Sequence, residues 1–222
     1  MNRVRFAPSP TGSLHLGSLR TAIVNFLFAK KTQATLVLRI EDTDKQRSTD
    51  ESTDVILENL QWMGLSFDEG PFFQSERTIL YQDHVKKLVQ LGKAYPCFCS
   101  VTNKIEGIIK DPCKNLSKTE AESRIKEHQP YAIRLNIPDN LIQFVDLIKG
   151  KVSFKGDCLE DFIIARTDGS VTYNFAVVVD DHEMGITHII RGEDHLPNTP
   201  KQIALYQAFG WNLPSFAHLP LI

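Results

Sequence analysis

The sequence has little of what marks several specialised protein classes. Its four cysteines in 222 residues are too few and too unevenly spaced to indicate a disulfide framework. No apolar run is long enough to span a membrane, and no signal-peptide pattern precedes Arg5, so we expect a cytoplasmic protein without a membrane partner. The 25 basic and 27 acidic residues nearly balance. No global basic field therefore indicates nucleic acid, although a local patch can still bind it.

What is present indicates a globular protein of the α/β class. Hydrophobic residues make up 42% of the chain, enough to bury a substantial core. Residues 3–7 read as a short strand, the segment from Gly17 to Lys31 has helical spacing, and 34–40 is a strand that is apolar on both faces. This order predicts a βαβ unit. "EDTD" at 41–44 then lies where open α/β sheets bind ligands.

The remaining chain predicts further elements by the same rules. We expect helices over 49–63, 77–91, 118–127 and 198–209, and strands at "YAIRLNI", "KVSF" and "FAHLPLI". Gly64 and Gly92 suit the position just after a helix. The β-branched residues of "FAVVVDD", 175–181, favour a strand. A change in the character of the sequence predicts an α/β domain over 1–94 and 162–222, interrupted by an inserted α+β subdomain over 95–161.

The opening stretch "RFAPSPTGSLHLGSLRTA" raises the first functional question. A glycine-rich turn that leads into a helix is a natural phosphate site, because free N–H groups and the helix dipole both face an anion. His15 at its mouth can donate to phosphate oxygens. The alternative is an ordinary turn with Ser18 as the N-cap and His15 exposed without a role. Taken alone, the stretch leaves both open.

Four stretches together carry a resemblance: the opening one, "LVLRIEDTD", "YNFAVVVDDHEMGITHIIRGEDH" and "FGWNLPSFAHLPLI". In this order, over almost the whole chain, they resemble bacterial-type glutamyl-tRNA synthetases, which are class I aminoacyl-tRNA synthetases. "HLGS" at 15–18 is similar to the His-Ile-Gly-His signature of that class. The resemblance implies a Rossmann-like, doubly wound parallel sheet with an inserted acceptor-stem-binding subdomain. It also implies a monomeric ligase in which 174–181 is a helix, against the strand propensity.

The resemblance implies a pocket for L-glutamate. Its residues would be Arg5, Ala7, Ser9 and Glu41 at the backbone end, and Tyr173, Val177 and Arg191 at the side-chain end. The chemistry agrees, because an arginine fork pairs with a carboxylate and leaves glutamine poorly matched. Arg5 could equally form a salt bridge with Glu41 or Asp42, which is compatible with that role.

The resemblance also implies an ATP site and a catalytic signature. The ATP residues would be Pro8, Thr11, Gly12, His15, Gly17, Glu193 and Asp194, and the catalytic ones His15, Gly17 and Ser18. Which of Glu193 and Asp194 points inward stays open. Activation needs no base, because the substrate carboxylate is the nucleophile and Mg²⁺ sits on the phosphates. For the acidic pairs Asp42/Asp44 and Asp180/Asp181 we favour helix caps or pairing with Arg39, Lys45 and Arg47 over metal ligation.

Three cysteines resemble the zinc module of some family members. They are Cys97, Cys99 and Cys113. A structural zinc site takes four ligands, and the fourth is not evident from Ile109, Asn115 or the distant His128. A vestigial site is the alternative. Cys158 reads as a core residue.

The resemblance leaves three functions to compare. The first is glutamate–tRNA ligation on tRNA-Glu, the second is glutamyl-Q tRNA(Asp) synthesis, and the third is a catalytically inactive binding module. Lys104, Lys110, Lys114 and Lys118 would face the acceptor end of the tRNA or simply form a solvated face. The family's Lys-Met-Ser-Lys-Ser-type loop would follow Ile222, so we expect this chain alone to bind glutamate or ATP weakly and to charge little tRNA.

Overall fold

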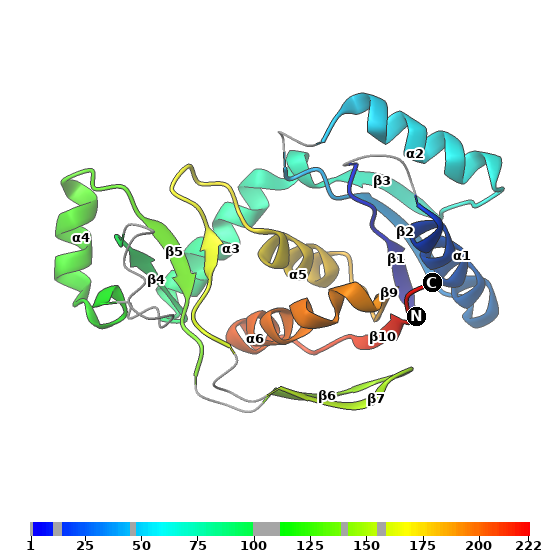
Figure 1. The fold of residues 1–222 in the computed structure, drawn as a ribbon. Helices are drawn as coiled ribbons and strands as arrows, with labels where there is room; N and C mark the ends of the chain where they lie inside the picture. Colours follow the sequence, from blue (N-terminus) through cyan, green and yellow to red (C-terminus); the bar gives the residue numbers. More distant parts are fainter. Residues whose placement is uncertain (1, 11–14, 45–47, 100–111, 139–141, 155–158) are drawn as a thin grey trace.

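The computed structural model describes the chain except for residues 1, 11–14, 45–47, 100–111, 139–141 and 155–158 (Figure 1). The described strands are β1 (Arg3–Phe6), β2 (Thr35–Ile40), β3 (Glu69–Phe73), β4 (Ala94–Cys97), β5 (Ala132–Leu135), β6 (Ile142–Asp146), β7 (Gly150–Phe154), β8 (Ile163–Ala165), β9 (His188–Gly192) and β10 (Ser215–Leu219). The described α-helices are α1 (Leu16–Thr32), α2 (Asp50–Trp62), α3 (Thr78–Gln90), α4 (Lys118–Lys126), α5 (Tyr173–Glu183) and α6 (Thr199–Phe209). Short 3₁₀ helices are η1 (Gln74–Arg77), η2 (Pro112–Asn115) and η4 (Glu193–Asn198).

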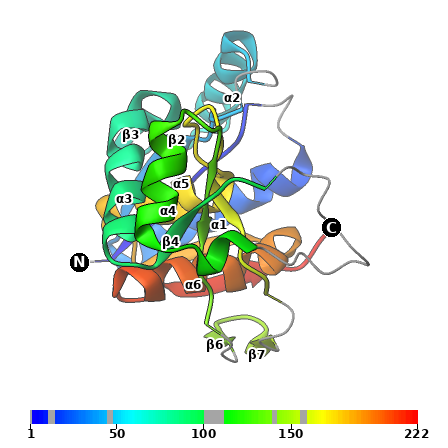
Figure 2. The same ribbon diagram turned by 90° about the vertical axis from the view of Figure 1, so that its left-hand side faces the viewer.

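The main sheet has the strand order β3-β2-β1-β9-β10-β6-β7. All neighbours in it are parallel except β6 and β7, which form an antiparallel hairpin at its edge. The doubly wound parallel sheet predicted from the sequence is therefore confirmed. A smaller antiparallel sheet has the order β4-β5-β8 and lies with α4 at one end of the molecule (Figures 1 and 2). The division at 95–161 stays a prediction. Strands β6 and β7 lie inside this range but extend the main sheet, and β8 lies after it but belongs to the small sheet.

Alternate residues of the central strands face different helices. Val4 and Leu36 pack with residues of α1 on one face. Val37, Ile189 and Phe216 pack with α5 and α6 on the other face. Because side chains alternate along a strand, Arg5, Arg39, Arg191 and His218 share the α5/α6 face with these apolar neighbours. The chain thus collects charged side chains on a face that is otherwise hydrophobic core.

The segment 175–181 corrects the propensity argument. It lies inside helix α5, as the family resemblance implied, and not in a strand. Every residue from Phe175 to Asp181 is buried. A helix covered on all sides has no polar stripe to reveal its period, so its β-branched residues were misleading.

Local signals at helix ends were more reliable. Gly64 and Gly92 follow α2 and α3 with φ of 69° and 66°, the left-handed conformation that glycine tolerates. Of the helices that the structure describes, not one combines the length and the apolar character needed to cross a bilayer.

Candidate active site

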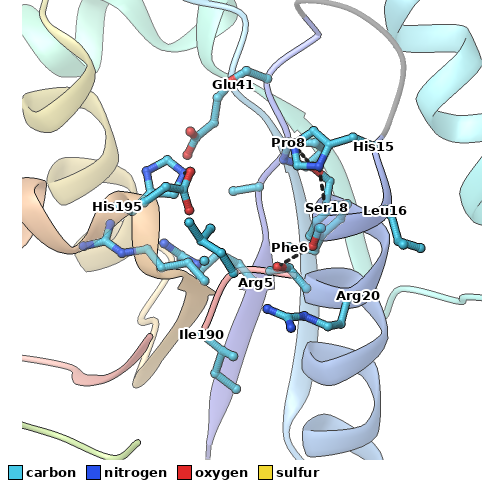
Figure 3. Close-up of a pocket in the computed structure, with 18 of the residues that line it drawn as sticks. Arg5, Phe6, Pro8, His15, Leu16, Ser18, Arg20, Glu41, Ile190 and His195 are labelled. Atoms are coloured by element: carbon cyan, nitrogen blue, oxygen red, sulfur yellow. Dashed lines mark hydrogen bonds and ion pairs between the residues drawn. The ribbon is translucent and has the colours of Figure 1, made fainter. Parts of the chain in front are cut away.

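A cavity of about 720 Å³ opens at the carboxyl ends of β1, β2 and β9. The amino end of α1 forms its opposite wall. In Figure 3, His15 and Ser18 lie on one side of this space, and Glu41 and His195 lie across from them. This is the edge at which open α/β sheets bind ligands.

The structure brings most of the expected site residues to this cavity. Those that line it are Arg5, Ala7, Pro8, Ser9, His15, Gly17, Ser18, Glu41, Tyr173, Arg191 and Asp194. Val177 is buried in the body of α5 and does not line it. Glu193 does not line it either, and its partners are described below. Thr11 and Gly12 lie outside the described residues, and the roles of all these side chains stay predictions.

His15 is the N-cap of α1. Its Nδ1 accepts a hydrogen bond from the backbone N–H of Ser18 at 3.3 Å, so the alternative with Ser18 as the cap is wrong. The imidazole supplies the acceptor that a serine would otherwise provide. Gly17 lies under the ring, and a Cβ added there would stand 3.1 Å from it. The first turn of α1 carries no acidic residue, which leaves the positive end of the helix dipole facing the cavity.

A buried ionic network forms the floor of the cavity. Asp181 on α5 accepts from Nε of Arg5 at 3.0 Å and from Nη1 of Arg39 at 2.8 Å. Nη2 of Arg39 donates to Glu41 at 3.0 Å. Arg5 therefore pairs with Asp181, and the alternative of a salt bridge to Glu41 or Asp42 is not found among the described residues. The reason is that α5 covers this face of the sheet and delivers Asp181 between the two arginines.

Burial and charge act against each other on the two carboxyl groups of this network. Burial raises the pKa of Glu41, and the nearby charges of Arg39 and Arg5 only partly oppose that rise. Burial also disfavours the charged form of Asp181, but Arg5 and Arg39 outweigh it and hold its pKa below the ordinary value. Asp181 is thus a fixed anion that orients two cations, while Glu41 presents its carboxyl group to the cavity.

Arg191 is a buried cation with a different environment. Its Nε donates to Nε2 of His218 at 3.1 Å, and its Nη2 donates to the hydroxyl of Thr199 at 2.9 Å. Its Nη1 has no hydrogen-bond partner among the described residues. No carboxylate of the described part of the chain forms an ion pair with it. A buried cation that lines a cavity and forms no direct ion pair within the described residues is a suitable partner for an anionic ligand group.

Tyr173 and His195 close the cavity on the α5 side. The phenol oxygen of Tyr173 lies 3.3 Å from Nδ1 of His195. Burial raises the pKa of Tyr173 and lowers that of His195, so both are neutral at physiological pH. His195 was missed at the sequence level. The available signal was its position three residues after the end of β9, beside the expected Asp194.

The structure separates the two acidic residues after β9. Glu193 pairs with Lys149 and accepts from the backbone N–H of Leu221 at 2.9 Å. Asp194 lines the cavity. A Cβ on Gly192 would overlap the Asp194 carboxylate, so this glycine permits its inward position.

The acidic pairs also find cations or donors. Asp180 accepts from Nε of Arg77 at 2.7 Å and lies 3.8 Å from Nε of Arg39. Asp42 accepts from the backbone N–H of Ser75 at 2.8 Å. The expected pairing of Asp180 and Asp181 with Arg39 is confirmed, whereas the expected partners 45 and 47 lie outside the described residues.

The three cysteines meet where β4 ends and η2 begins. The sulfur atoms of Cys97, Cys99 and Cys113 all lie within 4.8 Å of one another. Cys97 and Cys113 are buried, and the backbone N–H of Phe98 donates to the Cys113 sulfur at 3.3 Å. Three soft thiolates in mutual reach suit Zn²⁺. The candidate fourth ligands Asn115 and His128 are exposed, and residues 109 and 158 lie outside the described part.

Comparison with known proteins agrees with this arrangement. The family model of class I tRNA synthetases (E and Q), catalytic domain, matches residues 1–222. The glutamate–tRNA ligases of Coprothermobacter proteolyticus and Aquifex aeolicus are 48% and 50% identical to the chain, each over 99% of it. A crystal structure of a glutamate tRNA ligase from Elizabethkingia meningosepticum, in complex with its amino acid, superposes with a TM-score of 0.92 at 38% identity over 100% of the chain. The chain spans about half the length of these relatives, 50%, 49% and 49% in turn.

Proposed function

The chain belongs to the class I tRNA synthetases for glutamate and glutamine, and from this premise we propose that it is the part of a glutamate–tRNA ligase that activates L-glutamate. The whole protein would couple ATP cleavage to formation of glutamyl-adenylate and then transfer glutamate to the 3′ end of tRNA-Glu. The proposed role implies a cytoplasmic enzyme that acts as a monomer.

The observation that carries this proposal is the buried cation of Arg191, which forms no direct ion pair within the described part of the chain. Its partner-free Nη1 suits the side-chain carboxylate of glutamate, while Glu41 can accept from the substrate ammonium group. Glutamine would place a neutral amide against Arg191. The loss of one charge-assisted hydrogen bond costs about 1.5–3 kcal/mol, which gives a preference of roughly 10- to 150-fold for glutamate.

The nucleotide would bind along the α1 side of the cavity. His15 and the amino end of α1 face that side and would stabilise phosphate charge. Asp194 would accept from the ribose or adenine. The substrate α-carboxylate would attack the α-phosphorus of ATP. The bond between this phosphorus and the oxygen that bridges the α- and β-phosphates would break, and pyrophosphate would leave. Mg²⁺, when bound to the phosphates, neutralises their charge.

The second step needs access for the tRNA end. A neighbouring cavity of about 680 Å³ shares Ser9, Glu41 and Tyr173 with the first one. A terminal ribose hydroxyl entering there would attack the adenylate carbonyl and release AMP. The subdomain over 95–161 would guide the acceptor end, and its three cysteines would hold Zn²⁺ as a structural ion.

Binding of glutamate and glutamine to the chain and to an Arg191→Gln variant, measured by isothermal titration calorimetry, tests the proposal. We expect the wild type to prefer glutamate and R191Q to lose that preference. ATP–pyrophosphate exchange, with and without tRNA, then tests chemistry. Glutamate binding without ATP–pyrophosphate exchange in the presence of tRNA would indicate an inactive binding module. Transfer of glutamate to tRNA-Asp would indicate the glutamyl-Q alternative. Absence of glutamate binding and of exchange would refute the proposal.

A further inference from the structure

His218 and Asp146 form a buried chain behind Arg191. Arg191 on β9 and His218 on β10 are neighbours in register across two parallel strands. Nε2 of His218 accepts from Arg191 at 3.1 Å, and Nδ1 of His218 lies 2.6 Å from Oδ2 of Asp146. Asp146 ends β6, which pairs with β10 at Phe216. All three side chains are buried, so solvent does not compete for these bonds.

The chain of bonds fixes the tautomer of His218. A guanidinium N–H can only donate, so Nε2 must carry its lone pair toward Arg191. The proton of the neutral imidazole is then on Nδ1 and is donated to Asp146. Burial lowers the pKa of His218, which agrees with the neutral form.

Asp146 is itself held rigidly. Its Oδ1 accepts from the backbone N–H groups of Ile148 and Lys149, both at 2.9 Å, and from that of His218 at 3.3 Å. Its Oδ2 is left for the imidazole. Burial opposes its ionisation, but these hydrogen bonds hold its pKa below the ordinary value. The carboxylate is therefore a fixed acceptor at the end of the chain.

Thr199 at the start of α6 completes the restraint. Its hydroxyl accepts from Nη2 of Arg191 at 2.9 Å and lies 3.1 Å from Nε2 of His218, to which it can donate. Nε and Nη2, which form one edge of the planar guanidinium, are thus both held by the protein. Nη1 is buried and has no hydrogen-bond partner among the described residues, so it is the nitrogen left for a ligand acceptor.

We propose that His218 and Asp146 are positioning residues that fix the Arg191 guanidinium for the side-chain carboxylate of glutamate and so set the preference for glutamate over glutamine. This inference rests on the proposed function. The pair acts through Arg191 and does not touch the substrate. Preorganisation of this kind strengthens binding because the cation need not be ordered when the ligand arrives.

Asp146→Asn is the decisive variant. The three backbone donors keep the amide oxygen at the Oδ1 position, so the amide nitrogen must face His218. That forces the proton of His218 onto Nε2, where it meets the Nε–H of Arg191, donor against donor. We expect glutamate affinity and the glutamate-to-glutamine ratio to fall about tenfold, the effect of losing a hydrogen bond to a charged group, with ATP affinity unchanged.

Two further variants separate positioning from general damage. His218→Gln offers an oxygen to Arg191 and an N–H to Asp146, and we expect it to keep the ratio within about threefold of the wild type. His188→Gln is the matched control, a half-buried histidine at the other end of β9 whose Nδ1 bonds to Thr187 at 2.9 Å. It should leave the ratio unchanged.

The measurements are calorimetric titration with glutamate, glutamine and ATP, and ¹⁵N NMR of the histidine side chains. NMR should show His218 protonated on Nδ1 in the wild type and on Nε2 in D146N. A wild type protonated on Nε2, a D146N that keeps the ratio, or a loss shared equally by all three ligands would overturn the inference. If the wild type instead shows no preference for glutamate over glutamine, the proposed function fails. The specificity role of His218 and Asp146 then fails with it, whatever tautomer of His218 is found.

Discussion

Asp181→Asn tests the ionic floor of the cavity most directly. Both Arg5 and Arg39 bond to the same oxygen, Oδ1, and the other oxygen has no hydrogen-bond partner among the described residues. Asparagine can therefore keep both hydrogen bonds while it removes the charge, and its NH2 group takes the place of the unpartnered oxygen. The substitution changes the charge at this position without breaking the bonds to Arg5 and Arg39.

The expected cost follows from burial. Arg5 loses the one ion pair it makes within the described part of the chain, while Arg39 retains Asp180 and Glu41. Leaving a buried charge uncompensated costs about 3–5 kcal/mol. Because Arg39 is still paired, we expect the lower end, about 3 kcal/mol of unfolding free energy. For a domain of this size, that lowers Tm by roughly 6–12 °C.

Urea unfolding at neutral pH measures this change, with Asp83→Asn as the control. Asp83 pairs with Lys86 at 3.0 Å on the exposed surface of α3, where an ion pair contributes about 0–0.5 kcal/mol. Glutamate affinity should fall in D181N and not in D83N, because Arg5 lines the cavity. A D181N variant as stable as D83N would refute the argument that Asp181 is a required counter-charge.

Three other outcomes are expected. Gly17→Ala should weaken ATP binding about tenfold, because the added methyl group pushes the His15 ring aside. The stability of the protein should be kept or increased, because alanine is the better helix former. Calorimetry measures the ATP affinity and a thermal melt the stability, and an unchanged ATP affinity would contradict the prediction. The pKa of Asp181 is lower in the folded than in the unfolded state, so its contribution to stability is fully present above the unfolded pKa of about 3.9 and is lost as pH falls through the folded-state pKa. The difference in unfolding free energy between wild type and D181N should therefore become smaller in acid. Urea unfolding from pH 6 to pH 2 measures this difference, and a constant difference would contradict the prediction. The purified chain should contain about one Zn²⁺, and Cys99→Ser should lose it by atomic absorption; a wild type without zinc would favour the vestigial site.

Local sequence patterns determined much of this protein. The β1-α1-β2 unit, the glycines that end α2 and α3, and the ligand edge after β2 all follow from interactions between near neighbours in the chain. Alternation along the strands also fixed which residues share a face. The family resemblance then identified most of the side chains that line the cavity, because its motifs record positions that no periodicity reveals.

Only the tertiary structure decided which side chains pair with the buried charged residues. Arg5 meets Asp181 across 176 positions of sequence because α5 packs on that face of the sheet. Asp146 reaches His218 across 72 positions because β6 pairs with β10. The position of Asp194 at the cavity was decided in the same way. Contacts of this kind depend on how whole elements pack, and a buried helix or a buried ion pair leaves no period in the sequence from which that packing can be read.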